Sequence, residues 1–279
     1  MVALGATDDF GRAGNLGTAA YDLYDPGALP AMRAALGAVD SGRIAVSVLG
    51  GPYKCPPAPY EAAFLLDEPL RRRGVRDDVE VVVTTPLPAT LPMAGPEVSG
   101  RVAAALSVRG IELRTEHTVA GLDPVARSVS FDNGDALGYD LLLAFPQAVP
   151  PRVVADSALA GEGGWVWPDG HTARTAFDGV YALGDCAAVE PLPRAGAFAE
   201  AMGKVAATNI VADLTGTAPA SYDGTGYCFL ELPDQTASAL EGNFFAEPKP
   251  DLHIAEPDTE TYARKLAFEV ERLHEWLGA

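Results

Sequence analysis

The sequence of residues 44–85, IAVSVLGGPYKCPPAPYEAAFLLDEPLRRRGVRDDVEVVVTT, predicts a strand, a helix and a second strand in succession. Residues 44–49 and 79–85 are apolar runs of strand length, and residues 60–73 between them have the apolar spacing of a helix. A helix that joins two buried strands is typical of a parallel sheet with crossover connections. The stretch therefore predicts an α/β fold.

This alternation continues on both sides of the stretch. We expect helices at residues 30–39 and 98–109, strands at residues 111–118 and 139–144, and a hairpin turn at Asn133-Gly134. Further along, the pattern predicts short strands and turns at residues 163–175, a buried strand at 179–183, a long helix at 198–214, strands at 226–232 and 237–245, a proline-rich linker to residue 257 and a helix at 261–277.

The composition excludes several classes of protein. A net charge of −18 repels phosphate backbones, so no nucleic-acid partner is expected. No apolar run reaches the roughly 20 residues of a membrane span, and no signal peptide is visible, which favours a cytoplasmic location. Three scattered cysteines and four scattered histidines lack the spacing of a metal site, so no metal is expected and the histidines are assigned to the surface.

The loop after the strand at residues 44–49 lacks the G-x-G-x-x-G pattern that accommodates a dinucleotide pyrophosphate. Pro52, Tyr53 and Pro56 fill it, so NAD(P) binding is not expected there. The same loop contains Cys55, with Glu61 six residues later. Cys55 is either a small buried hydrophobe or a redox thiol with Glu61 as its proton acceptor.

A second candidate site follows the strand at residues 179–183. Gly184-Asp185 ends this strand, and Arg194-Ala195-Gly196 opens the long helix that follows. Asp185 is either a capping residue or an acceptor of hydrogen bonds from a sugar-like polyol.

Four segments together resemble the sulfide:quinone oxidoreductase and flavocytochrome c sulfide dehydrogenase group of two-dinucleotide-domain flavoproteins. The segments are PYKCPPAPYE (52–61), GVYALGDCA (179–187), PRAGAFAE (193–200) and GYCFLEL (226–232). The resemblance implies an NAD-like doubly wound three-layer domain that does not bind NAD, inserted in a partial FAD-binding domain and followed by a small C-terminal α+β domain. The corresponding boundaries are 1–18 and 142–216 for the FAD-binding parts, 19–141 for the NAD-like domain and 217–279 for the C-terminal domain.

The resemblance also implies roles for the candidate residues. Asp185, next to Gly184, would contact the ribityl chain of FAD. The helix opened by residues 194–196 would point its N-terminus at the flavin, where its dipole favours a reduced, anionic ring. Cys55 would pair with Cys228 beside the flavin, with Glu61 near the pair.

Three departures from the group qualify this assignment. The N-terminal glycine-rich FAD loop is absent, so we expect about one domain, on the order of a hundred residues, to be missing. A third active-site cysteine, present in some members near the stretch matching Gly17-Thr18, has no counterpart, and Thr90 and Tyr21 lie where some members have histidines. These departures favour a two-cysteine branch, with Cys186 as a structural residue.

The implied function is an FAD-dependent oxidoreductase that passes electrons from sulfide, or another small sulfur substrate, to a quinone or a cytochrome. The alternatives are a truncated or split-gene fragment without catalysis of its own and an NAD(P)H-dependent flavoprotein reductase. The chain could also form a homodimer or bind a separate N-terminal half. A location peripheral to the inner face of the membrane is possible but not favoured, because the apolar stripe Tyr262, Leu266, Val270, Leu273 and Leu277 of the acidic C-terminal helix is expected to pack on the protein's own core.

Overall fold

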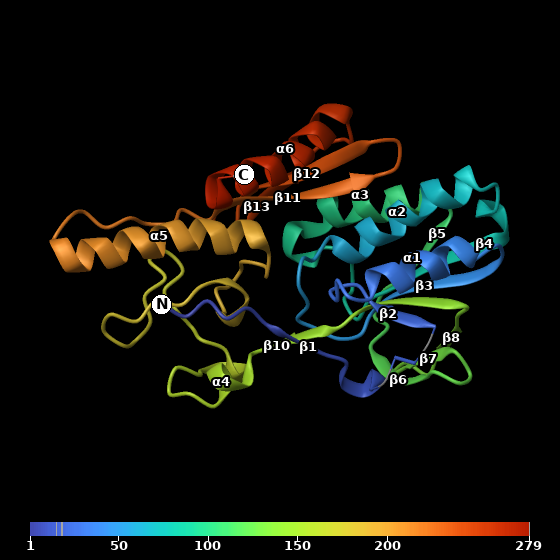
Figure 1. The fold of residues 1–279 in the computed structure, drawn as a ribbon, viewed down its shortest axis with the longest axis horizontal. Helices are drawn as coiled ribbons and strands as arrows, with labels where there is room; N and C mark the ends of the chain where they lie inside the picture. Colours follow the sequence, from blue (N-terminus) through green and yellow to red (C-terminus); the bar gives the residue numbers. More distant parts are fainter. Residues whose placement is uncertain (15, 18, 279) are drawn as a thin grey trace.

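The centre of the molecule is a five-stranded parallel sheet with strand order β2-β9-β3-β4-β5 (Figure 1). The computed structural model describes residues 1–14, 16–17 and 19–278, so the expectation about Thr18 lies outside the described residues. The helix α2 (Ala58–Arg72) connects the parallel neighbours β3 and β4, which confirms the α/β fold predicted from residues 44–85. The strands are β2 (Ala20–Asp22), β3 (Gly42–Val48), β4 (Val79–Thr84), β5 (Ile111–Arg114) and β9 (Leu141–Phe145).

Two layers cover the sheet. Because side chains alternate along a strand, Ile44 and Val46 face one core while Ala45 between them faces the other. The first core is closed by α1 (Leu29–Ala38), α2 and α3 (Gly95–Val108). The second is closed by an antiparallel meander of β6 (Val119–Asp123), β7 (Ser128–Phe131) and β8 (Ala136–Gly138). The expected hairpin turn joins β7 to β8, and Gly134 adopts the positive φ of 90° that favours glycine there.

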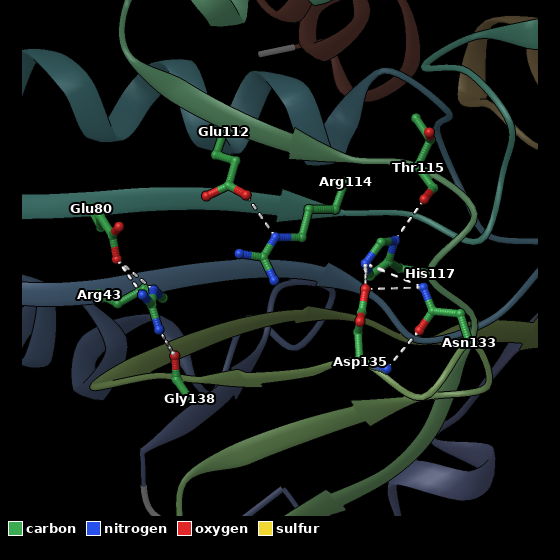
Figure 2. A network of polar contacts seen from close by, with 9 residues as sticks. All are labelled: Arg43, Glu80, Glu112, Arg114, Thr115, His117, Asn133, Asp135 and Gly138. Atoms are coloured by element: carbon green, nitrogen blue, oxygen red, sulfur yellow. Dashed lines mark hydrogen bonds and ion pairs between the residues drawn. The ribbon is translucent and has the colours of Figure 1, made fainter.

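Polar contacts between charged side chains connect the parallel sheet to the β6–β8 meander (Figure 2). Arg43 of β3 lies opposite Glu80 of β4, bonds it at 2.6 Å and donates to the Gly138 carbonyl of β8 at 2.9 Å. His117 contacts the Thr115 carbonyl at 2.6 Å and Asp135 at 3.2 Å, and its side chain is only 12% exposed. The surface assignment of this histidine was therefore wrong: its neighbours hold it as a link between β5 and the meander.

The segments after β9 carry little regular strand structure. The short β10 (Gln147–Val149) pairs antiparallel with β1 (Thr7–Asp9), and α4 (Arg152–Ala155) is a single turn. The strand expected at residues 179–183 is not a regular strand: among the described residues it makes isolated bridges, from Ala182 to Val2 and from Tyr181 to Arg174. The long helix α5 (Gly196–Thr215) follows as predicted.

The C-terminal part is a three-stranded antiparallel sheet with one helix on its outer side. Inward-facing residues Leu230, Leu240 and Ile254 join the core under α2 and α3. The proline-rich linker expected before residue 257 contains a strand, because this segment pairs with β12. The elements are β11 (Thr225–Leu232), β12 (Thr236–Asn243), β13 (Asp251–Ile254) and α6 (Thr259–Leu277).

The apolar stripe of α6 does not pack on the protein's own core, contrary to expectation. Its members are exposed by 43% to 73% at Leu266, Val270, Leu273 and Leu277. The helix instead turns the face of Thr261, Lys265, Phe268 and Arg272 to the sheet, because the outer side of β11 carries aromatic and charged groups that these residues match. Among the described residues, no helix is long and apolar enough to cross a membrane.

Candidate active site

Cys55 is held rigidly in the loop between β3 and α2. Its φ of 51° lies in the left-handed region, a conformation that costs a non-glycine residue on the order of 1–3 kcal/mol and persists only where its surroundings enforce it. The Cys55 N–H donates to the Arg194 carbonyl at 2.7 Å, and the Cys55 carbonyl accepts from the Ala58 N–H at 2.9 Å. The loop is thereby tied both to the first turn of α2 and to the segment that opens α5.

Cys228, on β11, is near enough for its charge to act on Cys55. The structure thus brings together two cysteines that no local pattern connects, and it holds them as free thiols rather than as a disulfide. The third cysteine, Cys186, is fully buried and contacts the Leu183 and Val2 carbonyls instead.

Burial makes both thiols weak acids. Desolvation raises the pKa of Cys55 to about 12, with further increases from Cys228 and Glu61 and opposing effects of the Ala58 backbone N–H and, more weakly, of Lys265. Burial, then the charge of Glu61, raises the pKa of Cys228 to about 11. In the reduced protein both groups are therefore neutral near pH 7.

These shifts predict a loss of stability at alkaline pH. Unfolded cysteines ionise near pH 8.5, whereas the folded thiols stay protonated to about pH 11 or 12, so the unfolded state loses its protons first. The free energy of unfolding of the reduced protein should fall by roughly 3 kcal/mol from these two groups between about pH 8.5 and pH 10. Urea unfolding at several pH values measures it. An unchanged pH dependence in the Cys55→Ser/Cys228→Ser double variant would contradict the assignment.

Glu61 links three elements beside the thiols. Its Oε2 accepts from the Glu231 N–H of β11 at 2.9 Å, and its Oε1 accepts from Lys265 Nζ of α6 at 3.1 Å. Lys265 also bonds the Glu231 carboxylate. Because β11 is an edge strand, Glu61 occupies an N–H that no neighbouring strand pairs.

The second candidate segment offers a polar cradle. Gly184, with a φ of 69°, and Asp185 form a short turn against the start of α5. The Asp185 carboxylate makes no hydrogen bond or ion pair with the described residues. Burial raises its pKa, against the charges of Arg194 and Lys54. Four of the five residues predicted to bind the cofactor, Gly184, Asp185, Arg194 and Ala195, line one small cavity of about 20 Å³, which has room for little more than a water molecule.

The N-terminus of α5 is open as well. Its N-cap residue is Ala195, which has no side-chain acceptor, and the Gly196 N–H finds no acceptor among the described residues. Arg194 lies over the Trp165 ring at 3.9 Å and donates from Nε to the Asp185 carbonyl at 3.1 Å, which fixes the two halves of the cradle to each other. A half-buried carboxylate without a partner and free helix N–H groups fit the ribityl hydroxyls and the carbonyl edge of a flavin.

The first turn of α2 offers little to a phosphate. Pro57 and Pro59 have no N–H, and the Ala58 N–H is bonded to Cys55. The buried Tyr53 occupies the loop, with its hydroxyl on the Pro56 carbonyl at 3.2 Å. A helix N-terminus that binds dinucleotides in related folds here holds the cysteine loop instead.

The family assignment follows from comparison with known proteins. Residues 61–205 match the family model described as pyridine nucleotide-disulphide oxidoreductase. The chain belongs to this family. The predicted fold class and FAD as the family's cofactor are thereby confirmed, and the family is one of oxidoreductases.

Two individual proteins, one compared by sequence and one by structure, are similar to this chain. The mitochondrial sulfide:quinone oxidoreductase of Schizosaccharomyces pombe is 26% identical over 248 residues, which cover 82% of this chain and 52% of the relative. The chain thus spans about half the length of the curated relative that it matches. The Aquifex aeolicus sulfide:quinone oxidoreductase structure matches with a TM-score of 0.84 at 20% identity, covering 97% of this chain and 67% of that one.

The structure of an NAD-dependent persulfide reductase from A. fulgidus is also similar. Its TM-score is 0.60 at 20% identity, with 86% of this chain and 43% of that chain covered. These structural likenesses concern the fold.

Sequence reasoning missed three residues of the site. Lys54 pairs with Asp8 at 2.6 Å beside the Asp185 cradle, and its position next to Cys55 was the only available signal. Trp165 and Lys265 lie far from the candidate motifs in sequence, so no local pattern points to them.

Proposed function

We propose that this chain forms the cysteine pair and the flavin-facing surface of an FAD-dependent oxidoreductase that oxidises sulfide, or another small sulfur nucleophile, and reduces a quinone or a cytochrome. The observation that carries the proposal is the 2.7 Å hydrogen bond from Cys55 N–H to the Arg194 carbonyl, because it joins the cysteine loop to the flavin cradle. The likeness to two sulfide:quinone oxidoreductases supports the choice of substrate.

The chemistry begins with the oxidised pair. Hydrosulfide attacks one sulfur of the Cys55–Cys228 disulfide, the S–S bond breaks, and one cysteine becomes a persulfide while the other leaves as a thiolate. A second sulfide or thiolate then removes the outer sulfur and leaves two reduced cysteines. Their return to the disulfide releases two electrons and two protons. When bound, FAD supplies the two-electron acceptor between the cysteines and the quinone or cytochrome.

The chain's own groups position these partners. The left-handed backbone at Cys55 is proposed to hold its thiol beside Cys228, with which it interacts electrostatically, while Asp185 and the N-terminus of α5 are proposed to hold the flavin. Glu61 is proposed to receive protons from the thiols, since its charge acts on both.

Anaerobic reduction of the FAD-loaded protein tests this function. Sodium sulfide should bleach the visible flavin band, and a water-soluble quinone or cytochrome c should restore it. A preparation that dithionite bleaches but sulfide does not would show that the proposal is wrong.

The NAD(P)H-dependent alternative makes a different prediction. With the α2 N-terminus committed to Cys55 and Tyr53 in the loop, NADH should bind with a dissociation constant of about 1 mM or weaker. Isothermal titration calorimetry measures this affinity. Micromolar binding, with NADH bleaching the flavin faster than sulfide, would favour the reductase instead.

A further inference from the structure

Glu61, Lys265 and Glu231 form a charged cluster contributed by α2, α6 and β11. The Lys265 ammonium bonds both carboxylates, and the three side chains are each only 22% to 26% exposed. Glu61 is held from two sides, by Lys265 at 3.1 Å and by the Glu231 N–H at 2.9 Å. A carboxylate anchored in this way stays in one place beside the thiols.

The groups that face Cys55 come from several elements. The charged acidic group is Glu61 of α2, which disfavours a thiolate at Cys55, and Cys228 of β11 does the same once it is itself ionised. The hydroxyls of Tyr24 and Tyr53 are neutral, because burial raises their pKa values far above the ordinary range. The Ala58 backbone N–H and, to a smaller extent, the charge of Lys265 favour a thiolate at Cys55.

Two other cations near the site serve different groups. Lys54 precedes Cys55 in the chain but pairs with Asp8 and acts on Asp185. The Arg194 guanidinium lies on Trp165, and only its backbone carbonyl meets the cysteine loop. Among the charged side chains near Cys55, Glu61 and Lys265 therefore form the pair whose charges oppose each other at the thiol.

We propose that Lys265 is a positioning residue for the cysteine pair, which neutralises Glu61 beside the thiols and so permits one of them to ionise. The inference rests on the proposed function, in which a thiolate must leave the opened disulfide. Without the ammonium, the Glu61 charge would oppose that thiolate at close range in a poorly hydrated site. The C-terminal helix would thus contribute to the chemistry of the Cys55 loop through Glu61, which lies 204 positions before Lys265 in the sequence.

Thiol alkylation tests this role without FAD or sulfide. The reduced 279-residue chain is treated with iodoacetamide at several pH values, and the labelling rate of Cys55 is followed by peptide mass analysis. Lys265→Met should slow the labelling of Cys55 about tenfold at each pH below the thiol's pKa, which corresponds to one pKa unit. Lys265→Arg should restore most of the labelling rate, because it keeps the positive charge beside Glu61. Glu61→Gln should increase the rate above that of the parent, because it removes the negative charge that disfavours the thiolate.

Arg264→Met is the matched control. Arg264 lies next to Lys265 on α6 and pairs with Glu241 of β12 at 2.7 Å, so its loss removes a docking contact of the helix without changing the charge beside Glu61. Labelling in this variant should equal that of the parent. An equal slowing in Arg264→Met, no rescue by Lys265→Arg, or an unchanged rate in both Lys265→Met and Glu61→Gln would overturn the proposal. Because the assay contains no sulfide, these outcomes are independent of whether sulfide is the substrate.

Discussion

Cys55→Ser and Cys228→Ser are each expected to lower the rate of sulfide-dependent flavin reduction by at least about a thousandfold in the FAD-loaded enzyme. A hydroxyl cannot form the disulfide that the proposed reaction opens, and it is a far poorer leaving group than a thiolate. The effect should be the same for both cysteines, because each is needed for the S–S bond. Rapid-mixing absorbance measurements of the flavin band give the rate.

Cys186→Ser is the control for this pair. Cys186 is fully buried, and its sulfur hydrogen-bonds to backbone groups, including the Leu183 and Val2 carbonyls, which a serine hydroxyl can also reach. Its flavin reduction should therefore stay within a few-fold of the parent's.

Thiol counts give a second check on the pairing. The oxidised, denatured chain should show one free thiol, and reduction should reveal all three cysteines. A mapped bridge that involves Cys186, or sulfide-dependent bleaching that survives in Cys55→Ser, would rule out the proposed pair.

Asp67→Asn is expected to produce the largest loss of stability, about 3–5 kcal/mol. Asp67 of α2 is buried and accepts hydrogen bonds from Arg71 at 2.7 Å and Arg76 at 2.8 Å. Arg76 is nearly buried too, with 10% of its side chain exposed. Removing the carboxylate leaves the Arg76 charge without a counterion in the interior.

The structural role of Arg76 explains the size of the effect. Its guanidinium donates to the carbonyls of Val79 at 2.9 Å and Arg109 at 2.7 Å, so it joins α2 to the starts of β4 and β5. Urea unfolding compares the variant with Glu68→Gln, which loses the neighbouring, exposed Arg72–Glu68 pair and should change stability by less than about 1 kcal/mol. Equal losses in the two variants would contradict the buried-pair interpretation.

Much of the central fold could be predicted because its signals are local. The apolar runs at residues 44–49 and 79–85, the helical spacing between them and the Asn133-Gly134 turn each depend on a few neighbouring residues. Strand β13 escaped prediction because its segment is rich in proline and becomes a strand only by pairing with β12. The exposure of the apolar stripe of α6 to solvent could not be predicted for a related reason. Its spacing defines a face, but which face meets the sheet depends on the side chains of β11.

The candidate site divides in the same way. Cys55, Asp185 and the start of α5 stand out because each lies in a short motif at the end of a strand or the start of a helix. Lys265 and Trp165 do not, since their roles arise only when distant segments pack together.

The chain's own pattern of apolar runs, turns and helix starts is enough to specify a parallel α/β sheet, whereas it leaves Cys55 and Asp185 with both structural and functional interpretations. Only the packing of the C-terminal sheet against α2 brings Cys228, Glu231 and Lys265 to the same place. The physical reason is the sequence distance over which each interaction acts. Hydrophobic periodicity and turn preferences act over a few residues, whereas the environment of the thiols is set by burial and charge between surfaces that meet only in the folded chain.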